Sequence, residues 1–461
     1  MRHPPPAPAP DMPFAMHRAI WAIALPAMLT NVATALFGLA DMWVIGRLGD
    51  ASAQGAVELG AKLLMGLLTV FNFLRSGTVA LTAQAAGRAD AEDQAATLAR
   101  AVAVALLIGL ILLLARPLVI PAGLDLLDAR GQLAADAHLY VGIRYWGGVA
   151  WLVNAVLIGW LIGRRRVRAV LLIEIFANIA HVALDLGLVL GLGWGVAGVA
   201  TATVASETAK LLALATILAG EAPARRALAM ARLPGTWQAA ELATLFRLNR
   251  DLFLRTLLLM AAFLLMTRAG ARQGATILAA NGILFQLFML SALILDGFES
   301  AAQVLCGEAR GGRDPRHFRR LVRALLLWGG ATGLVISLAY ALTGAPLAAS
   351  FTTAPDVAAA ASAHIGWAVA LPLVGMVSFV LDGVFIGATW TRAMLGTMAA
   401  ALAAFALALL AATPLGNHGL WLAFSLFLLA RGAGQALLLP RLIRRTLGTD
   451  ATADMRVAIG N

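Results

Sequence analysis

Apolar stretches of 20 residues or more recur along the whole chain, and they limit the possible folds more than any other feature. Examples lie at residues 101–120, 367–381 and 399–412 with their flanks. A helix needs about 20 apolar residues to cross the hydrocarbon core of a bilayer. Charged residues make up 13% of the chain, against roughly 25% in soluble domains. The sequence therefore predicts an all-α membrane protein.

Twelve transmembrane spans are predicted from these stretches. They lie near residues 17–46, 56–83, 97–116, 137–161, 167–190, 195–219, 252–271, 278–305, 321–344, 357–386, 393–413 and 417–440. The arginines gather in alternate connecting segments, at 164–168, 225–250, 310–323 and 441–445. Short cytoplasmic loops carry such an excess, so we expect a multi-pass protein of the bacterial inner (plasma) membrane with both termini in the cytoplasm.

The two halves of the chain repeat each other at an offset of 224 residues. Gly159 and Gly163 in the fourth span then align with Gly383 and Gly387 in the tenth. Other pairs that fall into register are Gly87 with Gly311, Asp90 with Asp314, Arg168 with Arg392, and Gly195 with Gly419. An even number of spans per half gives both halves the same orientation, which is a parallel repeat of the kind found in secondary transporters. Chance alignment of glycine-rich helices is the alternative.

This repeat predicts the domain organisation. We expect a disordered, Pro- and Ala-rich cytoplasmic tail at 1–16, a first lobe at 17–219, a basic cytoplasmic linker at 220–250, a second lobe at 251–440, and a cytoplasmic tail at 441–461. The net charge of +11 lies in the short loops, so it indicates membrane orientation and not nucleic-acid binding.

Acidic residues inside the spans of the first lobe need an explanation, because a carboxylate at the bilayer centre costs about 2.5–3.5 kcal/mol on insertion scales. Asp41 follows an expected kink at Pro26 in the first span. In the fifth span Glu174 precedes Asn178, His181 and Asp185, at spacings that place all four on one helix face. Such a face is expected to line a cavity. A polar network that only joins helices is the alternative.

The second lobe carries its own acids. Asp296, Glu299 and Gln303 share a face of the eighth span, and Asp382 lies in the tenth. Three arginines near span ends, Arg75, Arg144 and Arg255, could neutralise acids, so structural pairing remains open for this lobe. The predicted substrate cavity includes Asp41, Pro26, Asp296, Glu299, Asn281 and Asp382.

Enzyme signatures are missing from the sequence. Both lysines, Lys62 and Lys210, are followed by leucine, so no phosphate-binding loop exists. There is no HExxH motif and no GxSxG elbow. The single cysteine, Cys306, excludes a disulfide framework and a cysteine metal cluster. We expect no enzyme activity and no cofactor.

Several stretches resemble one transporter family. These are LADMWVIGRLG (39–49), ALDLGLVLGLGWGVAGVATATVAS (183–206), NRDLFLRT (249–256), LAANGILFQLFMLSALILDGFESAAQVLCGEARGGRD (278–314) and LDGVFIGATWTRAM (381–394). They look like the corresponding parts of DinF-type transporters of the multidrug and toxic compound extrusion (MATE) family. The resemblance implies two six-helix lobes around a central cleft.

The resemblance also implies site residues. Asp41 and Asp185 match the acids of the coupling-ion site, and Thr203, Tyr140 and Asn154 match residues that join their network. The family usually has asparagine one turn before the acid of the fifth span. This chain has His181 there, which favours a proton relay over a sodium site.

These observations predict a monomeric antiporter that exports cationic or amphipathic organic compounds in exchange for protons. The coupling residues are Asp41, Asp185, His181, Asn178, Thr203, Tyr140 and Asn154. One alternative is a sodium-coupled exporter with Na⁺ at Asp41 and Asp185. A lipid-linked precursor flippase and a membrane enzyme or signalling scaffold are further alternatives.

Overall fold

The computed structural model describes residues 13–47 and 49–448, and every regular element in these ranges is helical. The first half contains α1 (Pro13–Gly46), α2 (Ala51–Thr69), η1 (Val70–Asn72), α3 (Phe73–Gly87), α4 (Ala91–Leu126), α5 (Gly131–Arg144), η2 (Tyr145–Gly147), α6 (Gly148–Gly163), α7 (Val167–Asp185), the π-helix η3 (Leu186–Gly191) and α8 (Gly195–Gly220). The rest contains α9 (Ala222–Met230), η4 (Pro234–Trp237), α10 (Ala239–Ala271), α11 (Ala275–Gly311), α12 (Pro315–Ser350), α13 (Pro355–Ala363), α14 (Ile365–Gly387), α15 (Thr391–Ala411), η5 (Thr413–Leu415) and α16 (Gly416–Leu447).

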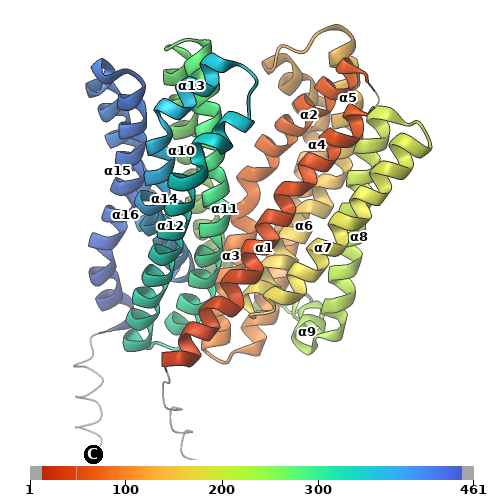
Figure 1. Ribbon diagram of the computed structural model, residues 1–461. Helices are drawn as coiled ribbons and strands as arrows, with labels where there is room; N and C mark the ends of the chain where they lie inside the picture. The colour runs from red at the N-terminus through yellow and green to blue at the C-terminus, as the bar shows by residue number, and fades with distance from the viewer. Residues whose placement is uncertain (1–12, 48, 449–461) are drawn as a thin grey trace, which may run out of the picture.

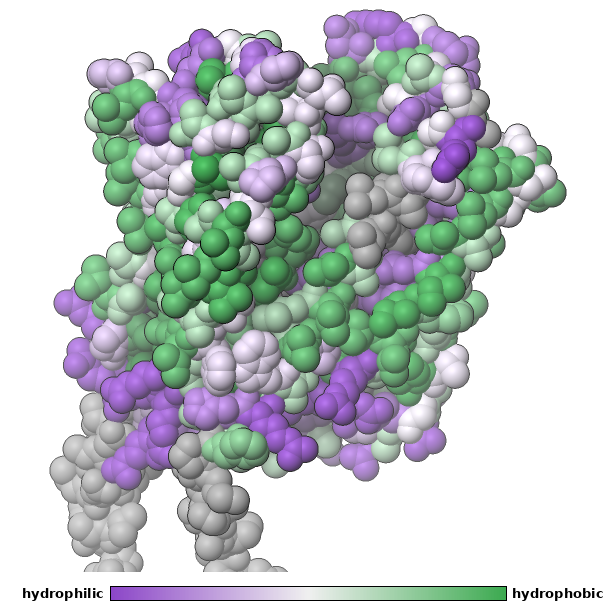
Figure 2. Space-filling view, viewed as in Figure 1, coloured by the Kyte–Doolittle hydropathy of each residue, from purple (hydrophilic) through white to green (hydrophobic). Residues whose placement is uncertain are grey.

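Twelve helical segments of the described chain are long and apolar enough to cross a membrane, which confirms the predicted number. Some spans join several elements: α2, η1 and α3 form one, and α5, η2 and α6 form another. Apolar side chains form a band around the middle of the molecule, and hydrophilic ones gather at its two ends (Figure 2). The predicted all-α membrane fold is thus confirmed.

Glycines at the repeat offset make equivalent contacts in the two halves. A Cβ on Gly159 would lie 2.6 Å from the carbonyl oxygen of Arg75. A Cβ on Gly383 would lie 2.3 Å from the carbonyl oxygen of Glu299. The offset of 224 residues relates both the glycines and the carbonyl groups. Small residues allow helix backbones to approach this closely, so the repeated glycines specify the same helix packing in each lobe.

The two lobes meet at the end of the molecule where α1 begins and α16 ends, called here the terminal end (Figure 1). There the Gln84 side chain of α3 donates a hydrogen bond to the carbonyl oxygen of Gly387 (2.8 Å). Arg165, in the turn between α6 and α7, forms an ion pair with Glu308 of α11. Toward the opposite end the lobes separate, and Figure 2 shows a hollow between them.

Three segments differ from the predicted boundaries. The tenth span is divided into α13 and α14 at His364, whose Nδ1 lies 2.8 Å from the carbonyl oxygen of Ala360. Helix α10 begins at Ala239 and so includes the last residues of the predicted linker, whose expected short helix is α9. The N-terminal tail was expected to extend to residue 16, but α1 begins at Pro13. Residues 1–12 and 449–461 of the two predicted tails lie outside the described residues.

Candidate functional site

Three titratable side chains of the first lobe meet inside the helix bundle. Nε2 of His181 on α7 contacts Oδ1 of Asp41 on α1, and it lies 3.0 Å from Oδ2 of Asp185 at the end of α7. His181 and Asp185 are fully buried, and Asp41 is 3% exposed. One ring nitrogen thus faces two carboxyl groups from two helices in a site closed to solvent.

The local structure of α7 explains this arrangement. His181 and Asp185 are one helical turn apart and therefore project from the same face. The α-helix changes to the π-helix η3 immediately after Asp185. Single turns of π-helix occur often at functional sites. Glu174 and Asn178 lie on the same face, as the spacing predicts.

The three groups together could hold a small cation. One ligand atom from each of Asp41, His181 and Asp185 lies within 4.8 Å of the others. Among the described residues, no other group of three histidine, cysteine or acidic side chains meets this condition. Two carboxylates and an imidazole can equally bind and release protons. The geometry alone therefore permits either kind of cation.

Asn178 and Thr203 lie near the three groups but bond elsewhere. Asn178 donates a hydrogen bond to the carbonyl oxygen of Ala33 (3.0 Å), which joins α7 to α1. The Thr203 hydroxyl donates to the carbonyl oxygen of Val199 in its own helix (3.1 Å). The carbonyl oxygen of Thr203 accepts a hydrogen bond from Ser206 (3.0 Å), whose hydroxyl lies 3.3 Å from Nδ1 of His181. The sequence analysis did not single out Ser206.

Tyr140 lies on α5, fully buried, and its hydroxyl accepts a hydrogen bond from Arg144 (2.5 Å). Arg144 and Tyr140 both interact electrostatically with Asp41. Asn154 on α6 donates to the carboxylate of Glu207 on α8 (2.9 Å). Tyr140 and Asn154 thus lie around the three groups without a direct hydrogen bond to any of them among the described residues.

A second buried charged cluster lies on α7 and α8. Nζ of Lys210 lies 2.9 Å from Oε1 of Glu207 and 3.2 Å from Oε2 of Glu174. All three side chains are at most 9% exposed. The sequence analysis noted Glu174 but not this pairing. Glu207 and Lys210 are charged residues inside a span, and that feature alone could have marked them as candidates.

In the second lobe, Asp382 on α14 is paired with cations. It forms ion pairs with Arg255 of α10 and with Arg431 of α16 (2.5 Å), and it accepts a hydrogen bond from Gln435 (2.6 Å). The expected pairing with Arg255 is present. Arg431 was not foreseen, although the repeat offset relates it to Glu207.

The remaining candidates of the second lobe lie along α11. Gln303 donates to the carboxylate of Glu299 (2.9 Å). Asp296 is half-buried and has no hydrogen bond or ion pair within the described part of the chain. Asn281 instead exchanges hydrogen bonds with Asn417 of α16 (2.8 and 2.9 Å). It lies 15 residues before Asp296, roughly 22 Å along the helix.

Pro26 lies inside α1, where this helix crosses α11 between the lobes. A Cβ on Gly297 of α11 would lie 2.4 Å from Cγ of Met28 and 2.7 Å from the carbonyl oxygen of Ala24. Pro26 is buried between these two contacts. Gly297 directly follows Asp296, so Pro26 and Asp296 lie at the same seam between the lobes.

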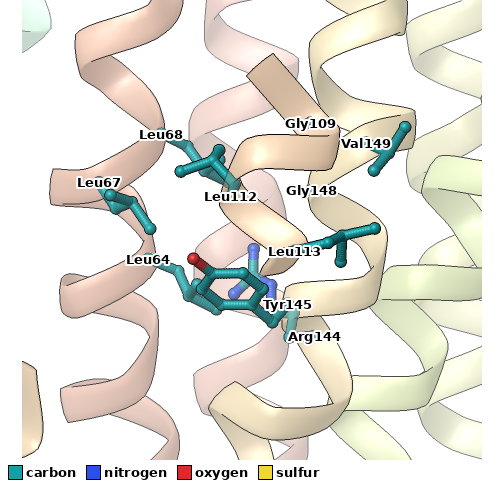
Figure 3. Close-up of a pocket in the computed structure, with 10 residues that line it drawn as sticks. All are labelled: Leu64, Leu67, Leu68, Gly109, Leu112, Leu113, Arg144, Tyr145, Gly148 and Val149. Atoms are coloured by element: carbon teal, nitrogen blue, oxygen red, sulfur yellow. The ribbon is translucent and has the colours of Figure 1, made fainter. Parts of the chain in front are cut away.

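A pocket in the first lobe is too small for an organic substrate. Its volume is about 10 Å³, which is room for one water molecule. Leucines of α2 and α4 line it together with Arg144 and Tyr145 (Figure 3). The hollow between the lobes is therefore the better place for a substrate.

The repeated architecture also appears in comparison with known proteins. A family model described as MatE matches the chain twice, at residues 26–186 and 252–413, once in each half. The chain belongs to the MATE family. It is 37% identical over 419 residues to the DNA damage-inducible protein F of Escherichia coli (strain K12), covering 91% of each chain. It is also 29% identical to a probable multidrug resistance protein, NorM, of Bradyrhizobium diazoefficiens, covering 88% of this chain and 89% of that one.

Solved structures of MATE proteins share the fold. The crystal structure of MATE in the bent conformation superposes with a TM-score of 0.86 at 19% identity, covering 94% of this chain and 97% of that chain. The eukaryotic MATE transporter AtDTX14 gives a TM-score of 0.79 at 14% identity, covering 94% and 98%. The protein is therefore a multi-pass MATE-family efflux transporter for multiple drugs or toxic compounds, with the twelve-helix fold of this family.

Proposed function

We propose that this MATE protein exports cationic or amphipathic organic compounds in exchange for protons, with Asp41, His181 and Asp185 as the proton-binding site. The observation that carries the proposal is the contact of one imidazole nitrogen with two carboxyl groups in a buried site. Groups this close titrate together and not independently. The charge of the site therefore changes as a unit when a proton binds.

The histidine favours protons over sodium as the coupling ion. An imidazole has an ordinary pKa near 6.5, so it exchanges protons around neutral pH. Hard cations prefer oxygen ligands, and the ring places a nitrogen between the two carboxyl groups. Sodium coupling is the alternative, because the three ligand atoms lie close enough together to hold a cation.

The proposed cycle uses the hollow between the lobes. The terminal end is taken to be cytoplasmic, in agreement with the arginine-rich segments, and both termini then lie in the cytoplasm of the inner membrane. The hollow faces the periplasm. A proton that binds the site from that side removes negative charge, so a cationic substrate loses attraction and leaves. The lobes then reorient, and release of the proton into the cytoplasm restores the charge that attracts the next substrate.

The proposal assigns the substrate to the seam between α1 and α11. Asp296 supplies an unpaired carboxyl group there, and Pro26 lies opposite on α1. The lobes at 17–219 and 251–440 move as units about the linker at 220–250, and a single chain carries out the cycle. Asp382 and Asn281 are engaged with their own lobe, so we assign them to its packing.

Dye efflux from everted membrane vesicles tests the coupling site. We expect a pH gradient to drive efflux by the wild-type protein in sodium-free buffer. Asp41→Asn and Asp185→Asn are expected to abolish this efflux while the protein remains folded. The control is Asp128→Asn, because the side chain of Asp128 is 82% exposed in a turn outside the bundle. Unchanged efflux in both site variants would place the coupling site elsewhere, and efflux driven by a sodium gradient alone would support the sodium alternative.

A further inference from the structure

The hydroxyl group of Ser206 lies between two hydrogen-bond acceptors. It donates to the carbonyl oxygen of Thr203 (3.0 Å), and it also lies 3.3 Å from Nδ1 of His181. Ser206 is 1% exposed. A serine hydroxyl carries one hydrogen and two lone pairs. It can therefore donate to only one of these two partners at a time, but it can accept a hydrogen bond as well.

The other ring nitrogen of His181 fixes which side of the ring can change its proton. Nε2 faces Asp41 and Asp185, and ionised carboxylates only accept hydrogen bonds. Nε2 must therefore carry a hydrogen while these acids are ionised. The difference between the neutral and the charged ring is then a proton on Nδ1, which faces Ser206.

We infer that Ser206 is a positioning residue that lets His181 gain and lose its proton at Nδ1 without moving the ring. This inference rests on the proposed proton-coupled function. When the ring is neutral, Ser206 donates its hydrogen to Nδ1. When the ring is charged, Nδ1–H donates to the oxygen of Ser206, and the hydroxyl hydrogen turns to the carbonyl oxygen of Thr203. Rotation of one hydroxyl hydrogen satisfies both states.

Charged groups on the surrounding helices act on the same site. Asp41 approaches from α1, Asp185 lies on α7, and Tyr140 and Arg144 lie on α5. The charged residues nearest to Ser206 along α8 are Glu207 and Lys210, which are paired with each other and with Glu174 of α7. These pairs leave Ser206 as the hydrogen-bond partner of Nδ1. The two states of the ring are thus distinguished by a neutral hydroxyl and not by a second charge.

The pH dependence of efflux with Ser206→Ala tests the inference. Without the hydroxyl, the buried N–H of the charged ring has no acceptor, and hydrogen bonds to charged groups are the stronger ones. We expect half-maximal proton-driven efflux to require about tenfold more protons, a shift of about one pH unit to lower pH. Ser206→Thr keeps a hydroxyl and should restore the wild-type profile.

Ser378→Ala is a matched control. Ser378 is a fully buried serine of the second lobe, and its hydroxyl donates to the carbonyl oxygen of Gly375 three residues earlier, as Ser206 does to Thr203. It should leave the midpoint unchanged. A wild-type midpoint in Ser206→Ala overturns the inference. If Asp41→Asn and Asp185→Asn retain proton-driven efflux, the proposed function fails, whatever the serine variants do.

The nitrogen chemical shifts of the His181 ring provide a second measurement that does not depend on the folding of a variant. Histidine-labelled wild-type protein is compared with His181→Asn to assign the signals. Above the midpoint the ring should be neutral, with its proton on Nε2 and Nδ1 as an acceptor. Below the midpoint both nitrogens should be protonated. A neutral ring with its proton on Nδ1 overturns the inference.

Discussion

Gly87 of α3 lies directly against the backbone of Glu308 in α11, so that a Cβ on the glycine would be 2.0 Å from the carbonyl oxygen of Glu308. The repeat-related contact has the same form: a Cβ on Gly311 would be 2.1 Å from the carbonyl oxygen of Gln84. The two lobes therefore meet backbone to backbone at the terminal end. No side chain fits between them without moving the helices apart.

Gly87→Ala is expected to open this contact. Overpacking a close helix contact costs about 1–3 kcal/mol, and here the added methyl group would meet a backbone atom that cannot turn away. We expect a lower thermal unfolding temperature of the purified protein and reduced efflux. Gly311→Ala should behave in the same way, because it meets the equivalent carbonyl group.

The control for this prediction is Gly66→Ala in α2. Nothing lies within 4 Å of the position that its Cβ would take. Alanine also has a higher helix propensity than glycine by about 1 kcal/mol, so this variant should be as stable as the wild type or more so. Equal stability of Gly87→Ala and Gly66→Ala would contradict the proposed close contact.

The glycine pattern made the repeat predictable from the sequence. Gly159 and Gly383 stand at equivalent places because equivalent helices cross there, and a helix crossing of this kind tolerates little else. The number of spans followed from the length of the apolar stretches. The division of the tenth span at His364 was not predictable, because the residues on both sides of it are as apolar as the rest of the span.

The residues of the site were predictable only in part. The spacing of His181 and Asp185 places them on one face of α7, whatever that helix packs against. The approach of Asp41 depends on how α1 packs on α7, and here only the family resemblance pointed to it. Ser206 gave no signal, because a serine in a helix commonly bonds to its own backbone. Its contact with His181 depends on the rotation of α8.

Lys210→Met is expected to destabilise the first lobe. The substitution leaves Glu207 and Glu174 without their shared cation in a buried place. Removal of one partner from a buried ion pair costs about 3–5 kcal/mol. We expect a marked fall in the thermal unfolding temperature of the protein in detergent, together with loss of efflux as a consequence.

Replacement of all three charges separates a structural cluster from a functional one. The variant Glu174→Gln, Glu207→Gln, Lys210→Met carries no uncompensated charge, so much of the lost stability should return. If the cluster is structural, proton-driven efflux returns with it. A stable triple variant without efflux would mean that these charges take part in transport.

Asp382→Asn is expected to act through stability in the second lobe. The substitution leaves Arg255 and Arg431 buried next to each other without their shared carboxylate. Loss of about 3–5 kcal/mol is expected for such an uncompensated pair. Thermal unfolding measures this loss. An Asp382→Asn protein that is as stable as the wild type but transports no substrate would contradict the assignment of Asp382 to lobe packing.

Asp296→Asn is expected to act through substrate binding and not through stability. Its carboxyl group has no hydrogen bond or ion pair with the residues that the structure describes, so an amide of similar size leaves no partner unpaired. A lipophilic monovalent cation such as tetraphenylphosphonium should bind about tenfold more weakly, which corresponds to about 1.4 kcal/mol. An uncharged amphiphile of similar size should bind unchanged, because only the charge of the side chain is removed. Asp356→Asn is the control, since this acid of the same lobe bonds to Thr276 at the end opposite the terminal end. Equal weakening for both ligands would show that the shape of the seam, and not the charge of Asp296, had been altered.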